Sequence, residues 1–148
     1  METINKIDKL LMTHALHVAT QSDDTRKVGA VLYFKDTDTF IEDFNRFPEG
    51  VQYESSRCEK PLKYKWYEHA ERNVIYKAAQ HKHVSTKNST MYSTYFPCVD
   101  CTRAIIQAGI KRLVVNKEPD YKHATWGNDW TIANEMLHES NIETTFLT

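Results

Sequence analysis

The sequence is poor in glycine, proline and cysteine, with four, four and three of these residues among 148. That content differs from the compositions of collagen-like chains and of disulfide-rich secreted chains. No apolar run approaches the roughly 18 residues of a membrane-spanning helix, and the first residues, METINK, lack the apolar core of a signal peptide. Because an odd cysteine count does not suit a disulfide framework, we expect free thiols or metal ligands in a cytoplasmic protein.

The chain also lacks an excess of charge of either sign. Nineteen Lys and Arg residues face 20 Asp and Glu residues, which gives a net charge of -1. Nucleic-acid-binding proteins usually carry a clear basic excess, so we expect neither nucleic acid nor a membrane as a partner. A small anionic ligand would need only one or two local cations. Length and composition are typical of a single globular domain, expected to span residues 1–148.

Hydrophobic periodicity predicts an alternation of helices and strands. Ile4, Ile7, Leu11, Ala15 and Val18 predict a first amphipathic helix. Further along, we expect strands at 28–34 and 40–44, a helix at 69–80, a strand at 90–95, a helix at 98–108 ending before Gly109, a strand at 112–116, a helix at 129–139 and a strand at 142–146. This order predicts an α/β fold with three layers, in which a five-stranded mixed sheet has helices on both faces.

Two further details concern residues 45 to 80. In the helix at 69–80, Ala70, Val74 and Ala79 are expected to face the core. From Asn45 to Trp66 no period is sustained, so we expect a long loop that faces a substrate. The alternative, a solvated surface loop whose cations are offset by its glutamates, stays open.

Two short motifs carry the chemistry, H-A-E at 69–71 and P-C-V-D-C at 97–101. His69, Cys98 and Cys101 are the ligand types that zinc prefers, and three ligands leave a fourth position for water. Cys98 and Cys101 share one face of a helix, and Pro97 is expected in its first turn. In mid-helix, His69 and Glu71 would point about 200° apart, so they can converge only if a helix begins there. Ligands bind at the carboxyl ends of strands in such sheets, where we expect both motifs.

The C-x-x-C motif alone has other interpretations. It also occurs in redox pairs, and a structural zinc site would need a fourth ligand. Cysteine or histidine residues elsewhere could supply that ligand, namely Cys58, His81, His83 and His123. The combination with H-A-E favours a hydrolytic site, in which Glu71 carries protons.

Together the motifs resemble those of the zinc-dependent cytidine and deoxycytidylate deaminases, whose signature is H-x-E followed by P-C-x-x-C. The resemblance covers most of the chain and is closest to the deoxycytidylate (dCMP) branch. It rests on SDDTRKVGA at 22–30, NRFP at 45–48, EHAERN at 68–73, FPCVDC at 96–101 and IIQAGI at 105–110.

This resemblance implies a cytidine-deaminase-like fold and one catalytic Zn²⁺ per chain, held by His69, Cys98 and Cys101. Glu71 would shuttle protons while a zinc-activated hydroxide attacks C4 of dCMP, giving dUMP and ammonia. Homo-oligomers, dCTP and dTTP effectors, and Mg²⁺ accompanying a triphosphate effector are also implied. The alternatives are a deaminase of another cytosine nucleotide or nucleoside, a tRNA adenosine deaminase, and a non-catalytic zinc-stabilised binding module.

The resemblance also suggests substrate contacts. Asn45 matches the family asparagine that contacts the sugar, whereas Arg46 departs from the frequent Asn-Gly-x-Pro pattern. A guanidinium group can bind phosphate bidentately. The predicted substrate-binding set is Asn45, Arg26, Ser22, Arg46, Arg57 and Ala70. For the arginines, plain surface exposure is the alternative.

Overall fold

In the computed structural model, which describes residues 4–148, five strands form one mixed sheet. The strands are β1 (Gly29–Phe34), β2 (Thr39–Phe44), β3 (Thr90–Ser93), β4 (Arg112–Val115) and β5 (Glu143–Phe146), in the order β2-β1-β3-β4-β5. Strand β1 pairs antiparallel with β2 and β3, whereas β3, β4 and β5 are parallel. Therefore β2, β3, β4 and β5 end at the same edge of the sheet, and β1 begins there.

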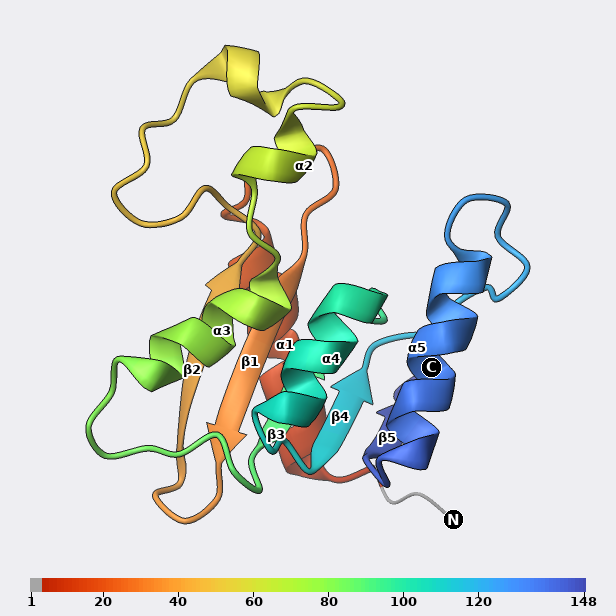
Figure 1. Ribbon diagram of the computed structural model, residues 1–148. Coiled ribbons are helices and arrows are strands. Elements are labelled where there is room, and N and C mark those ends of the chain that lie inside the picture. The colour runs from red at the N-terminus through yellow and green to blue at the C-terminus, as the bar shows by residue number, and fades with distance from the viewer. Residues whose placement is uncertain (1–3) are drawn as a thin grey trace.

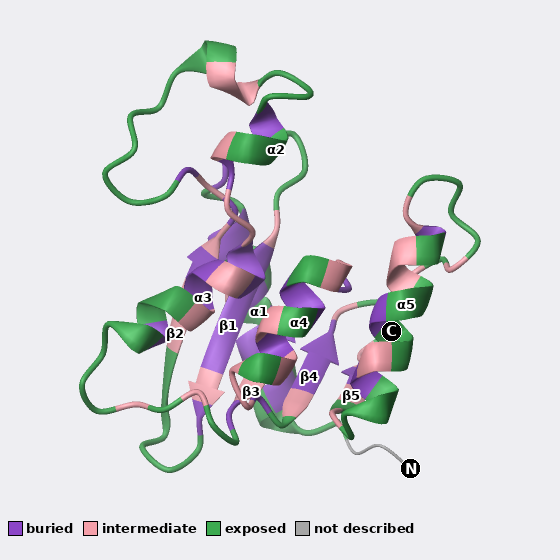
Figure 2. Ribbon diagram, in the orientation of Figure 1, coloured by how far each residue is buried: buried purple, intermediate pink, exposed green. Residues whose placement is uncertain are grey.

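Helices cover both faces of this sheet (Figure 1). They are α1 (Lys6–Ala19), α2 (Lys63–Trp66), α3 (Ala70–Ala79), α4 (Val99–Gln107) and α5 (Gly127–Glu139), with a 3-10 turn η1 (Ser55–Cys58). Helix α1 packs on one face, where Leu11, Met12 and Ala15 meet Val31 and Tyr92. On the other face, side chains of α3, α4 and α5 form a separate core. The buried residues in Figure 2 follow these two interfaces, and the predicted three-layer architecture is confirmed.

The buried face of α1 differs from the prediction. Asn5 caps the helix through a reciprocal capping box with Asp8. Leu11, Ala15 and Val18 are buried as expected, but Ile7 is 45% exposed and Asp8 is fully buried. The Asp8 carboxylate accepts hydrogen bonds from Arg112 at 2.7 and 2.9 Å and from Tyr92 at 2.8 Å. A charged residue therefore occupies the core position that the apolar pattern assigned to its neighbour.

The other predicted elements are present with ends shifted by no more than two residues, and Gly109 follows α4 at φ +78°. The prediction for Ala79 is wrong, because Ala78 faces the core and Ala79 is exposed. The expectation of a featureless loop from Asn45 to Trp66 is also wrong, since it contains η1 and α2. Figure 1 shows this excursion standing beyond the edge of the sheet where β2 ends. None of the helices in residues 4–148 has the length and apolar character needed to cross a membrane.

Candidate active site

Both motifs lie at the same edge of the sheet, as the sequence predicts. The chain leaves β2 at Phe44, makes the excursion and returns to begin α3, whereas α4 begins shortly after β3. A bridge between Arg46 and Glu68 joins the two ends of the excursion, with backbone hydrogen bonds of 3.2 and 2.8 Å. The excursion is thereby closed at its base, and His69 follows directly.

His69, Cys98 and Cys101 converge at the two helix starts. Their candidate ligand atoms all lie within 4.8 Å of one another. The Nδ1 atom of His69 is 3.6 Å from the Cys98 sulfur and 3.3 Å from the Cys101 sulfur. His69 is the N-cap residue of α3 and Glu71 lies in its first turn, so the expected placement is confirmed. Pro97 is not in the first turn of α4 as predicted, because Cys98 is the N-cap and the helix begins at Val99.

The protonation of this group is strongly coupled. The hydrogen bond with Cys101 lowers the pKa of Cys98 to about 4, and the same contact together with burial raises the pKa of the Cys101 thiol. The Cys98 sulfur is therefore ionised more readily than the Cys101 sulfur. The hydrogen bond with Cys98 raises the pKa of His69. One imidazole and two closely spaced sulfurs, one of them readily ionised, are a donor set that fits Zn²⁺.

The structural-zinc alternative requires a fourth protein ligand. Among residues 4–148, the group of converging metal ligands consists of His69, Cys98 and Cys101. Cys58 lies elsewhere, where its sulfur is 3.4 Å from the Tyr67 hydroxyl. The group therefore leaves one position of a tetrahedral zinc site to a non-protein ligand.

Glu71 is buried beside this group, with 4% of its surface exposed. Burial raises the pKa of its carboxyl group, and positive charge on His69 lowers it. A carboxyl group in such surroundings exchanges protons closer to neutral pH than an exposed one, which is the property a proton-transfer group needs.

A cavity of about 230 Å³ opens directly onto His69, Glu71 and Cys98. Three of the predicted substrate contacts, Asn45, Arg26 and Ala70, also line it. Asn45 is engaged within the protein: its amide donates to the Arg26 carbonyl at 2.8 Å and accepts from the Val28 N–H at 2.9 Å. The Arg26 guanidinium instead lies 4.5 Å from the centre of the Tyr95 ring.

The other three predicted contacts do not line this cavity. Ser22 is buried and donates to the Asn45 carbonyl at 2.8 Å, so it fixes the loop before β1. Arg46 binds Asp43 through two hydrogen bonds of 2.8 Å and faces a different depression. Arg57 stacks on Trp66 with its guanidinium 3.9 Å from the ring centre.

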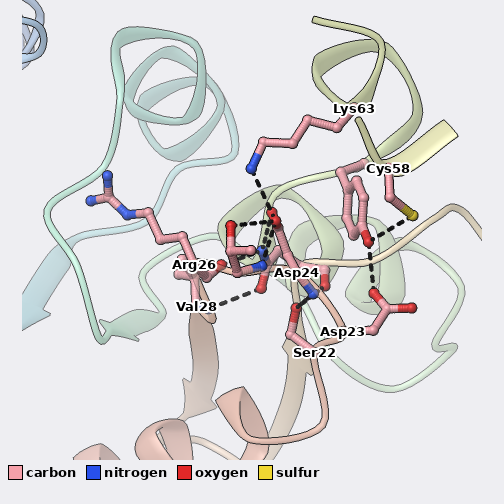
Figure 3. A network of polar contacts seen from close by, with 10 residues as sticks. Ser22, Asp23, Asp24, Arg26, Val28, Cys58 and Lys63 are labelled. Carbon is pink, nitrogen blue, oxygen red and sulfur yellow. Dashed lines mark hydrogen bonds and ion pairs between the residues drawn. The ribbon is translucent and has the colours of Figure 1, made fainter. Parts of the chain in front are cut away.

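Residues of the excursion that the motifs did not mark do reach the cavity. Lys60, Lys63 and Tyr64 line it, and the Lys63 ammonium donates to the Asp24 carboxylate at 3.0 Å. Figure 3 shows this contact, with the Arg26 side chain pointing away from it. The cationic content of the excursion is visible in the sequence. The sequence does not show which lysine turns toward the cavity, because Lys63 is placed by its contact with Asp24, 39 residues away.

A further part of the cavity wall is aromatic. Trp126 and Trp130 line it, with ring centres 6.5 Å apart. Trp126 precedes α5 and Trp130 lies in its first turn. Gly127 allows this turn to pack closely, since a Cβ atom there would lie 2.3 Å from the Tyr121 carbonyl oxygen. These are flat apolar surfaces of the kind that bind a heteroaromatic ring.

Comparisons with known proteins agree with this geometry. Residues 5–117 match the family model described as the cytidine and deoxycytidylate deaminase zinc-binding region. An uncharacterized deaminase in the luxG 3′ region of Aliivibrio fischeri is 29% identical over 84% of this chain and 82% of its own length. The deoxycytidylate deaminase of Enterobacteria phage T2 is 45% identical over 51% of this chain, a match that spans 36% of that protein. The apo crystal structure of dCMP deaminase from cyanophage S-TIM5 superposes with a TM-score of 0.76 and 25% identity, covering 97% of this chain and 99% of that one.

Proposed function

This chain belongs to the cytidine and deoxycytidylate deaminase family, and from that membership we propose that it hydrolyses dCMP to dUMP and ammonia. The observation that carries the proposal is the cavity that joins the metal-ligand group and Glu71 to Arg26. A nucleoside 5′-phosphate needs these two subsites at opposite ends of one pocket.

His69, Cys98 and Cys101 would hold Zn²⁺. Zinc bound there supplies a Lewis acid that makes water nucleophilic at neutral pH. His69 and the cysteines come from two helix starts, so α3 and α4 together fix the ligand geometry.

Glu71 would move the protons of the reaction. It takes one proton from the attacking water and delivers it to the ring nitrogen beside C4. It then takes the second proton from the new hydroxyl group on C4 and delivers it to the leaving amino group, so that C4 becomes a carbonyl and ammonia departs. The net reaction consumes one water molecule. Burial suits Glu71 to this exchange, because it raises the pKa of the carboxyl group above that of an exposed glutamate.

Other residues that line the cavity would hold the rest of the nucleotide. Trp126 and Trp130 offer apolar rings to the base. Arg26 would bind the phosphate, because no ion pair engages its guanidinium within residues 4–148 and Tyr95 supports it from one side. Lys60 adds a second cation at the cavity, whereas the charge of Lys63 is offset by Asp24.

Further expectations remain predictions beside this proposal. We retain a homo-oligomer and dCTP or dTTP effectors as predictions, along with a cytoplasmic location and no nucleic-acid partner. The Mg²⁺ predicted to accompany an effector lacks support among residues 4–148, where no second group of three converging metal ligands occurs. A deaminase of another cytosine compound or of tRNA adenosine, and a non-catalytic zinc module, are the alternatives to be tested.

The test is ammonia release from a panel of dCMP, CMP, deoxycytidine, dCTP and an RNA hairpin, each measured with and without dCTP as an added effector. We expect dCMP to have the highest kcat/KM. Faster turnover of deoxycytidine than of dCMP would contradict the phosphate subsite. Absence of turnover with the whole panel, in protein that contains zinc, would favour the non-catalytic module.

A further inference from the structure

We propose that Asp129 is a positioning residue that holds Cys98 in place from a different helix. The inference concerns the metal-ligand turn at residues 96–99 and rests on the proposed zinc site. Its structural basis is one hydrogen bond: the Asp129 Oδ2 atom accepts the backbone N–H of Val99 at 3.0 Å. Val99 is the residue after Cys98 and the first residue of α4.

The Val99 N–H belongs to the first turn of α4, where backbone donors have no partner inside the helix. The Cys98 sulfur accepts the Cys101 N–H at 3.4 Å, so this sulfur already serves as the cap of α4. A sulfur that also binds a metal must keep one direction relative to the helix start. The carboxylate of Asp129 fixes the peptide that connects this sulfur to α4, and its negative charge is favourable at a helix N-terminus.

Asp129 occupies the third position of α5, where an acidic side chain commonly accepts the N–H of its own helix cap. In this chain its Oδ2 atom reaches α4 instead, and the backbone N–H of Trp126 at the start of α5 donates to His123 Nδ1 at 3.1 Å. Asp129 therefore joins α5 to α4, while His123 accepts the N–H at the cap of α5.

A second contact attaches the other end of the same turn. The ring of Phe96, two residues before Cys98, packs edge-on against Tyr121 with ring centres 6.3 Å apart. Tyr121 lies in the segment that leads into α5, and the backbone of that segment packs against Gly127. Cys98 is thus held between two attachments to the chain segment that also carries the aromatic wall. We infer that Asp129 fixes the metal ligand relative to the surface that receives the base.

The experiment measures release of zinc from the loaded protein to an excess of a chelating indicator. For Asp129→Ala we expect release about ten times faster than for the wild type, the lower end of the loss that follows removal of a group behind a metal ligand. Asp129→Asn keeps an oxygen acceptor and should release zinc at close to the wild-type rate. We also expect Asp129→Ala to lower kcat on dCMP more than it raises KM.

Two variants of α5 serve as controls. Glu135 is exposed on α5, and Glu135→Ala should leave zinc release unchanged. Leu137 is 2% exposed in the core, so Leu137→Ala loosens α5 without removing the Asp129 carboxylate. Leu137→Ala should lower the unfolding midpoint at least as far as Asp129→Ala does, yet release zinc slowly. Should Asp129→Ala fail to fold, Asp129→Glu, which displaces the oxygen by one methylene, takes its place with the same expectation.

Wild-type release rates in Asp129→Ala would overturn the inference. Equal acceleration in Leu137→Ala would overturn it as well, because general loosening of α5 would then explain the effect. An Asp129→Asn variant that releases zinc as fast as Asp129→Ala would also overturn the inference. These outcomes leave the proposed function intact, whereas wild-type protein that binds no zinc would refute both.

Discussion

Replacing Arg26 by alanine separates recognition of the phosphate from the chemistry at the base. Arg26 lines the cavity, and its guanidinium rests 4.5 Å from the centre of the Tyr95 ring. Asn45 donates a hydrogen bond to the backbone carbonyl of Arg26, and Lys63 donates one to the Asp24 carboxylate. Neither contact uses the Arg26 side chain. The substitution should therefore remove a phosphate ligand and leave the metal-ligand group undisturbed.

The size of the effect follows from the interaction that the substitution removes. A hydrogen bond to a charged group contributes about 1.5–3 kcal/mol, and each 1.4 kcal/mol is a factor of about ten. We expect kcat/KM for dCMP to fall about ten- to a hundredfold in Arg26→Ala on this basis. Turnover of deoxycytidine should change by less than about threefold, because this substrate has no phosphate for Arg26 to bind.

The assay follows the absorbance change of deamination with both substrates. Arg57→Ala is the matched control, since Arg57 stacks on Trp66 away from the cavity and its removal should spare both substrates alike. Arg26→Lys keeps the charge without the bidentate geometry and should fall between the wild type and Arg26→Ala. Equal reductions on dCMP and deoxycytidine would refute the assignment of Arg26 to the phosphate.

Three further predictions concern the Glu71 carboxyl group, the core and the turn that carries the aromatic wall. Glu71→Gln should retain the fold and the zinc while steady-state turnover falls about 100- to 10,000-fold; near-wild-type turnover would remove Glu71 from proton transfer. Burial raises the pKa of Asp8, but hydrogen bonds from Arg112 and Tyr92 lower it, and the net pKa is lowered. The ionised Asp8 therefore stabilises the fold above the unfolded pKa of about 4, and this stabilisation is lost as the pH falls through the folded pKa. Asp8→Asn should therefore cost about 3 kcal/mol of unfolding free energy at pH 7, and in urea titrations this difference should shrink below about pH 4; a pH-independent difference would contradict the linkage. Gly127→Ala should cost about 1–3 kcal/mol in the same titrations, because a Cβ atom has no room there; unchanged stability would show that this turn relaxes freely.

The sequence was most informative where the chemistry depends on neighbouring residues. His69 and Glu71 lie two positions apart, and helical geometry requires a helix to begin at that point if both are to reach one metal. The structure has that start at Ala70. The placement of the cysteine pair could be predicted equally well, because residues three positions apart lie on one face of a helix. Only the place of Pro97 differed, because the helix begins at Val99 and leaves Pro97 outside its first turn.

Contacts between distant segments were harder to predict. Apolar spacing assigned Ile7 to the core, but the buried ion pair of Asp8 with Arg112 turns α1 so that Asp8 faces inward. The four residues of α2 are too few to show a helical period. The sequence therefore gives no indication that Lys63 faces the cavity. Asp129 meets Val99 across 30 residues, and no local pattern marks that contact.

The proposed dCMP hydrolysis depends on zinc bound by the His69, Cys98 and Cys101 group. The direct measurement is to strip the purified protein with a chelator, add back Zn²⁺ in steps, and record bound metal and dUMP formation in the same samples. We expect activity to rise in proportion to bound zinc and to reach its plateau at about one zinc per chain. Full dUMP formation by metal-free protein, or a zinc-loaded protein that forms no dUMP, would contradict this expectation.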